Sequence, residues 1–144
     1  MTNFNPNEPG IANGNYFALP NSLEESDIAI ISVPWDVTTS YRPGTHKGPE
    51  SIIEASVQVD LFDPLVPDAW ETKIGTVPVN IQILKDNKKY RKIAQSVIAE
   101  LEKGTDYSEL TPLLDKVNKA SESLNKEVFA LCKEQINSGR ITGV

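Results

Sequence analysis

The sequence contains few of the residues that metal sites, disulfides and nucleophilic catalysis require. Its 144 residues include one cysteine, Cys132, and one histidine, His46. A single cysteine excludes an intrachain disulfide and is typical of a reducing compartment. One histidine, with no Asp-x-Asp or Asp-x-His pattern near it, does not provide the clustered ligands of a metal cage. Walker, GxGxxG, GxSxG and CxxC motifs are also absent, which excludes the common nucleotide-binding and nucleophile signatures.

The sequence also lacks blocks of like charge and long apolar runs. Acidic and basic residues are interspersed, and the net charge of −6 leaves no basic face for nucleic acid. No apolar run is long enough to span a bilayer, and MTNFNPNEPG lacks the basic and apolar regions of a signal peptide. We therefore predict a cytoplasmic protein without a nucleic-acid or membrane partner. Its length fits one globular domain or a piece of one.

The order of predicted elements indicates the α/β class. Residues 27–33, DIAIISV, are nearly continuously aliphatic, as in a strand buried in a parallel sheet. Residues 1–26, rich in Asn, Pro and Gly, predict an irregular arm, either loose or bound to a second copy. The remaining residues, 27–144, then form the folded α/β part. The other predicted elements are a helix over 49–56, a half-exposed strand over 57–62 and a final strand over 140–144. A weaker strand is predicted over 73–79, where Pro78 favours an edge position or a strand end.

Two long helices follow from apolar residues spaced three and four apart, over 90–101 and 110–136. Two antiparallel helices covering a sheet explain this pattern, and so does a coiled-coil partner. Cys132 lies beside the apolar stripe of the second helix, which predicts a buried structural thiol. The first helix is predicted to begin at a cap formed by Asp86 or Asn87 and to end at Gly104. The second is predicted to begin at Thr111–Pro112 and to end at Gly139.

The most distinctive stretch is residues 40–50, SYRPGTHKGPE, between the first strand and the short helix. Pro43 and Pro49 restrict the backbone, whereas Gly44 and Gly48 reach angles closed to other residues. Pro49 also suits the first turn of a helix. The composition predicts a stiff loop of defined shape, in the place where α/β proteins position binding groups.

Asp36, Tyr41 and Arg42 are the best candidates for contact with a ligand. Arg42 can pair with a substrate carboxylate, or with Asp36 to hold the loop's shape; both readings stay open. For Trp35 and Tyr41, packing beneath the loop is favoured over walling a pocket. His46 is predicted to make surface hydrogen bonds rather than to bind a metal.

The run ISVPWDVTTSYRPGTHKGPESIIEAS resembles the N-terminal signature of the ureohydrolase superfamily of arginases, agmatinases, guanidino-acid hydrolases and formimidoylglutamase. KIGTVPV is similar to the family's next strand, and GRITGV to the strand before its first metal-ligand motif. The Tyr-Arg-Pro-Gly sequence at residues 41–44 is most similar to that of agmatinase-like members. The matching positions are Pro34, Trp35 and Asp36, then Arg42, Gly44, Gly48 and Pro49, and in the helix Ile52, Ile53, Ala55 and Ser56.

The resemblance implies a partial three-layer arginase-like fold, with a mostly parallel sheet flanked by helices and truncated at the C-terminal side. It also implies hydrolysis of a guanidino or formimino group, with release of urea or a related small molecule. In the family two manganese ions, or nickel in some relatives, generate the attacking hydroxide. The intact enzymes are usually trimers or hexamers.

The family's Gly-Asp-His, Asp-x-His-x-Asp and Asp-x-Asp motifs are missing from this sequence. We therefore expect no catalytic residue and no metal ligand here, an inactive chain on its own, and poor solubility from an exposed sheet flank. One alternative is a non-catalytic interaction module that binds a full-length partner, and another is an unrelated small-molecule-binding α/β domain. The residues predicted to shape the loop or the active-site rim are Asp36, Tyr41, Arg42, Gly44, His46, Gly48 and Pro49.

Overall fold

The computed structural model describes residues 4–144, which divide into two compact units. The sheet unit contains the residues up to Ser32 together with Pro49–Pro78 and Leu131–Val144. The helical unit contains Val33–Gly48 and Val79–Ala130. The distinctive loop therefore belongs to the helical unit, together with most of the two long helices.

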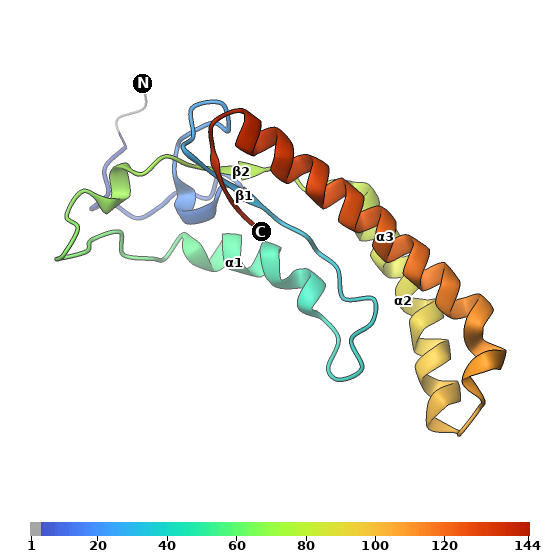
Figure 1. Cartoon of the computed structure of the whole chain (residues 1–144). Coiled ribbons are helices and arrows are strands. Elements are labelled where there is room, and N and C mark those ends of the chain that lie inside the picture. The colour runs from blue at the N-terminus through green and yellow to red at the C-terminus, as the bar shows by residue number, and fades with distance from the viewer. Residues whose placement is uncertain (1–3) are drawn as a thin grey trace. The chain divides into compact units, whose positions relative to one another are not determined.

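The sheet unit is built on three parallel strands in the order β2-β1-β3 (Figure 1). These strands are β1 (Ile28–Ile31), β2 (Ile74–Val77) and β3 (Ile141–Gly143). Strand β1 is the central strand; Ala29 and Ile31 on one of its faces are buried, and Ile28 and Ile30 on the other are half-buried. The predictions of a first strand in a parallel sheet, a second strand at an edge and a final strand are all confirmed.

The N-terminal arm is pinned to the rest of the sheet unit by hydrogen bonds around a short 3-10 turn, Tyr16–Ala18. The backbone N–H of Tyr16 donates to Thr76 Oγ1 at 3.1 Å, and its phenolic oxygen lies 2.8 Å from Ser32 Oγ. The N–H of Phe17 donates to Ser56 Oγ at 2.8 Å, at the end of helix α1 (Gly48–Ser56). The helix predicted over 49–56 is thereby confirmed.

Residues 57–62 do not form the predicted strand; bends and turns lead instead to a 3-10 turn at Ala69–Glu71. Two aspartates favour local turns over strand pairing, because Asp60 accepts from the N–H of Phe62 and Asp63 from the N–H of Leu65. The apolar alternation over 57–62 is therefore not accompanied by pairing with any strand of the described sheet, whose order is β2-β1-β3.

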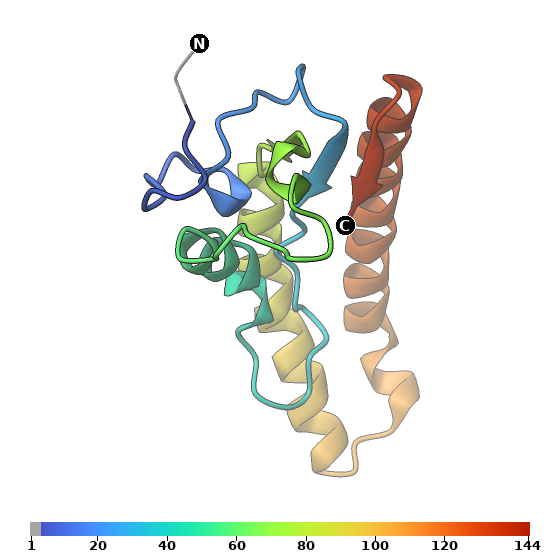
Figure 2. The same ribbon diagram turned by 90° about the vertical axis from the view of Figure 1, so that its left-hand side faces the viewer.

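The helical unit contains α2 (Ile81–Glu102) and the first part of α3 (Tyr107–Asn137), which run antiparallel around a short turn (Figure 2). Its core is formed by Val37, Ala94 and Val117, against which Trp35, Tyr90 and Ile93 pack. The packing predicted for Trp35 is confirmed. None of the helices in residues 4–144 combines the length and the apolarity needed to cross a membrane.

Both long helices begin earlier than the sequence pattern predicted. The side chain of Asn80 caps α2 by accepting from the N–H of Gln82 at 2.9 Å. Asp106 does the same for α3, by accepting from the N–H of Ser108 at 2.8 Å. Pro112 consequently lies inside α3 instead of in its first turn. The predicted ends are confirmed, because Gly104 and Gly139 adopt φ values of 86° and 84°.

Candidate functional site

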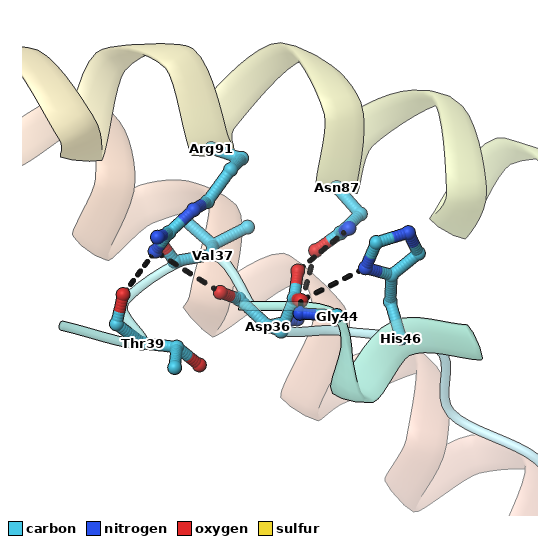
Figure 3. Close-up of polar contacts among 7 residues, drawn as sticks. All are labelled: Asp36, Val37, Thr39, Gly44, His46, Asn87 and Arg91. Carbon is cyan, nitrogen blue, oxygen red and sulfur yellow. Dashed lines mark hydrogen bonds and ion pairs between the residues drawn. The ribbon is translucent and has the colours of Figure 1, made fainter. Parts of the chain in front are cut away.

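The loop that follows β1 is organised around the carboxylate of Asp36, whose side chain is 2% exposed (Figure 3). Its Oδ2 accepts from the backbone N–H of Gly44 at 2.7 Å and lies 2.8 Å from His46 Nδ1. Its Oδ1 accepts from Asn87 Nδ2 at 3.0 Å, and Asn87 Oδ1 accepts from the N–H of Asp36 at 2.8 Å. One buried side chain thus joins the two ends of the loop to helix α2.

The donors around Asp36 keep it ionised. Burial acts to raise the pKa of this carboxyl, but the hydrogen bonds from His46, Asn87 and Gly44 and the charge of His46 hold the pKa well below its usual range. An ionised carboxylate only accepts hydrogen bonds, so Nδ1 of His46 carries the proton that it shares with Asp36. The predicted surface role of His46 is therefore only partly right, since its ring binds a buried acid.

Arg91 fixes the loop backbone from the same side of α2 (Figure 3). Its Nη1 donates to the carbonyl oxygens of Asp36 at 3.4 Å and Val37 at 3.0 Å, and also to that of Thr39. A single guanidinium thereby pairs three carbonyl groups that no strand or helix ladder satisfies. Its Nε is buried and has no hydrogen-bond partner among residues 4–144.

Sequence reasoning missed Asn87 and Arg91 as parts of this cluster, and it assigned Asn87 to a helix cap. A signal for Asn87 was present, because this polar residue falls on the apolar stripe of α2, in register with Tyr90 and Ala94. Buried polar groups need partners, so an Asn at such a position predicts a specific hydrogen bond. Arg91 gives no comparable signal.

The loop between Asp36 and His46 contains two residues with positive φ, Arg42 at 47° and Gly44 at 137°. The value at Gly44 is open only to glycine, and this geometry aims the Gly44 N–H at Asp36. Arg42 forms no ion pair with Asp36 in the described chain; its guanidinium lies 5.2 Å from the ring centre of Tyr41. The loop-holding alternative for Arg42 is therefore wrong, and His46 takes that place.

Tyr41 does not pack beneath the loop, because 74% of its surface is exposed. Gly48 and Pro49 form the first turn of α1, and no hydrogen bond to the Asp36 carboxylate comes from them. Cys132 is a free, half-buried thiol on α3, so it is less buried than the predicted buried structural thiol. The structure brings together Asp36, Gly44 and His46, and the active-site-rim role of all seven predicted residues stays a prediction.

The described residues do not fit a manganese centre. Residues 4–144 contain no group of three His, Cys, Asp or Glu side chains placed to hold a metal ion. Asp36 Oδ2 and His46 Nδ1 lie 2.8 Å apart, but no third such side chain among the described residues joins this pair to complete a metal-binding group. No catalytic step is therefore assigned to this part of the molecule.

Comparisons with known proteins match residues 26–107 to the model of the Arginase family. This range contains β1, the Asp36 loop, α1, β2 and α2. No solved structure matches the chain at a comparable level of significance.

Individual relatives match over part of their length. Mitochondrial agmatinase of Gallus gallus is 34% identical over 106 residues, which are 67% of this chain and 31% of the relative. Mitochondrial guanidino acid hydrolase of Homo sapiens is 30% identical over 120 residues, or 76% of this chain and 34% of the relative. Agmatinase of Bacillus anthracis is 44% identical over 43 residues, which are 30% of this chain and 15% of the relative. The matched region spans about a third or less of these relatives.

Proposed function

This chain belongs to the arginase family, and we propose that it forms the N-terminal portion of a metal-dependent hydrolase of guanidino or formimino C–N bonds. The match of residues 26–107 to the family carries this proposal. Relatives named agmatinase and guanidino acid hydrolase support a small guanidino substrate. The expected products are an amine or acid and urea, or a related small molecule.

The proposed contribution of this chain is the shape of the active-site rim. A loop that approaches a substrate needs a fixed backbone, because misplacement of a binding group costs reaction rate. The hydrogen bonds that join Asp36 to Gly44, His46 and Asn87 provide that rigidity. Tyr41 and Arg42, which are exposed at the turn of the loop, are the proposed contacts to the substrate.

We assign the metal chemistry to residues outside this chain. Two manganese ions in the intact enzyme would activate water and polarise the substrate carbon. The donor set of residues 4–144 does not fit them, so we propose that the 144-residue chain is inactive by itself. The intact enzyme is further proposed to be cytoplasmic, agmatinase-like and a trimer or hexamer, although the chicken and human relatives are named as mitochondrial.

The direct test compares the purified 144-residue chain with a longer polypeptide that continues in the same reading frame past Val144. Manganese content is measured by elemental analysis, and urea release is measured with agmatine, guanidinobutyrate and arginine. We expect stoichiometric manganese and urea release in the longer polypeptide alone. Asp36→Ala in the longer polypeptide should lower kcat/KM while leaving the manganese content unchanged.

Metal binding or turnover by the 144-residue chain would contradict the assignment of the metal ligands to other residues. A longer polypeptide that binds manganese but hydrolyses no guanidino compound would contradict the proposed reaction.

A second candidate function is the binding of another polypeptide at the edge of the sheet. Strand β3 pairs only with β1 within the described residues, and Ile141 on it is 69% exposed. An unpaired strand edge with an exposed apolar residue favours pairing with another chain. Stable co-purification with a full-length family member, without metal or activity in the longer polypeptide, would favour this function over hydrolysis.

A further inference from the structure

The helical unit contains an open hollow of about 530 Å³ between the turn at Gly44–Lys47 and one side of α2. Four cationic residues line it: Lys47 from the loop, and Lys88, Arg91 and Lys92 from α2. Asp36 is the single acid in the lining, and hydrogen bonds already occupy both of its oxygens. A cluster of cations is notable in a chain whose net charge is −6.

The three lysines have no protein counter-ion. The ion pairs among the described residues are His46–Asp36 and Lys103–Glu100, so no acid oxygen lies within 4 Å of these ammonium groups. All three residues are exposed, and they therefore stay fully hydrated and available. Cations gathered around one hollow raise the local positive potential there.

Helix α2 presents three of its cations to the hollow. Lys88 and Lys92 are four residues apart, and Arg91 lies three after Lys88, so these positions share a face. Like charges at this spacing destabilise a helix. An anion bound between them would remove that repulsion, whereas solvent only screens it.

We propose that this hollow binds a small anion that carries a phosphate group. The choice of phosphate follows from the donors that remain free. Arg91 is the residue suited to bidentate carboxylate binding, but its Nη1 is committed to the loop carbonyls. Its Nε has no hydrogen-bond partner within residues 4–144 but is buried, so the exposed charged donors of the hollow are the lysine ammonium groups, which bind phosphate as point charges. The site does not depend on the proposed hydrolase activity.

The test uses the 144-residue chain and inorganic pyrophosphate as the probe, with calorimetry and NMR at low ionic strength. We expect saturable binding that weakens as salt is added, because salt screens exposed charges. The ring signals of the only histidine, His46, should shift during the titration, since His46 also lines the hollow. Succinate should bind more weakly than pyrophosphate.

Lys88→Gln with Lys92→Gln should weaken pyrophosphate binding roughly three- to tenfold, the effect of losing two exposed charge contacts. The matched control is Lys116→Gln with Lys126→Gln, which removes the same charge from exposed positions of α3 and should leave the affinity unchanged. Glutamine is a good helix former, so both variants should keep the helical circular dichroism of the parent chain.

Three results would overturn the proposal. The first is the absence of saturation at about 10 mM pyrophosphate, well above the affinity expected for several charge contacts. The second is an equal loss of binding in the two double variants, which would indicate attraction to overall charge. The third is succinate binding as tight as that of pyrophosphate, which would remove the assignment to phosphate.

Discussion

Asp36 decides the conformation of the loop at the scale of single residues. Its carboxylate satisfies a backbone N–H, an imidazole and a side-chain amide, all drawn from within the helical unit. Its removal would leave three donors without an acceptor in a largely buried place. A buried donor without an acceptor lowers the free energy of unfolding by more than one hydrogen bond adds to it, because the donor has lost its water in the folded state and gained no partner.

Asp36→Ala should therefore lower the free energy of unfolding by about 2–4 kcal/mol. Urea unfolding followed by circular dichroism measures this change. Asp115→Ala is the control, because Asp115 is exposed on α3 and should change stability by less than about 0.5 kcal/mol. Equal effects of the two substitutions would show that the Asp36 cluster adds nothing to stability.

The lowered pKa of Asp36 predicts a loss of stability in acid. In the unfolded chain this carboxyl titrates near its ordinary pKa of about 3.9, so below about pH 4 the unfolded state takes up the proton first. Its stabilising contribution is thus fully present above that pKa, and is lost as the pH falls through the native value. Unfolding in urea at pH 7, 4 and 3 measures the trend.

Asp36→Asn is the matched variant for this pH dependence. Glu25, Glu100 and Asp106 also have lowered pKa values, through hydrogen bonds at the surface, and they contribute to acid sensitivity in both proteins. The difference between parent and variant should therefore shrink as the pH falls below about 4. A difference that stays constant down to pH 3 would show that Asp36 titrates normally in the folded chain.

At the scale of elements, α2 acts as the support of the loop. Arg91 donates to three carbonyl groups of the loop backbone. Asn87 binds both the backbone and the side chain of Asp36. A helix is a rigid scaffold, so the loop inherits the rigidity of α2 through these contacts. The loop should loosen without unfolding when one contact is removed.

Arg91→Met keeps much of the side-chain volume and removes the donors. Hydrogen exchange of the amides over 37–44 should become about tenfold faster, which corresponds to about 1.4 kcal/mol of lost local stability. Amides in the middle of α3 should be unaffected. Lys85→Met, at an exposed position of the same helix, serves as the control. Unchanged exchange in Arg91→Met would mean that the loop holds its shape without α2.

The start of α2 offers a separate test at this scale. Asn80 caps the helix through its side-chain oxygen and also donates to Glu127 Oε1 at 2.6 Å. Asn80→Ala should cost about 1 kcal/mol of unfolding free energy, as is usual for the loss of an N-cap. Asn80→Asp keeps the capping oxygen but places a second acid beside Glu127. In thermal unfolding, the parent chain should be the most stable, Asn80→Asp the next and Asn80→Ala the least stable. A stability of Asn80→Ala equal to that of the parent would exclude a capping role.

At the scale of the whole molecule, the chain exposes several large apolar side chains. Phe129 is 69% exposed, Ile136 57% and Ile141 69%. Phe129 and Ile136 are seven residues apart on α3 and share a face of that helix. Exposed apolar groups that lie together favour association with other surfaces.

The purified chain should therefore self-associate with rising concentration in sedimentation velocity experiments. Phe129→Lys with Ile136→Lys should reduce this association. Asn118→Lys with Asn125→Lys is the control, because it adds the same charge at exposed polar positions of α3. A chain that sediments as a monomer at every concentration would contradict the prediction, as would equal effects of the two double variants.

The sequence by itself determined the features that depend on short-range pattern. Apolar spacing predicted the two long helices, glycine predicted their ends, and the aliphatic run of residues 27–33 predicted a strand in a parallel sheet. The special residues around Arg42 and Gly44 also carried the resemblance that the family match confirms. These signals lie within a few residues of one another, so local geometry is enough to read them.

Only the tertiary structure decided which side chains meet. Asp36 binds His46 rather than Arg42, and two of its other partners, Asn87 and Arg91, lie about fifty residues further along the chain on α2. The strand expected over 57–62 did not form either: these residues pair with no strand of the described sheet, and Asp60 and Asp63 accept from nearby backbone N–H groups instead. Contacts between distant residues depend on which groups the packed fold brings within hydrogen-bond distance, and local sequence pattern does not encode that choice.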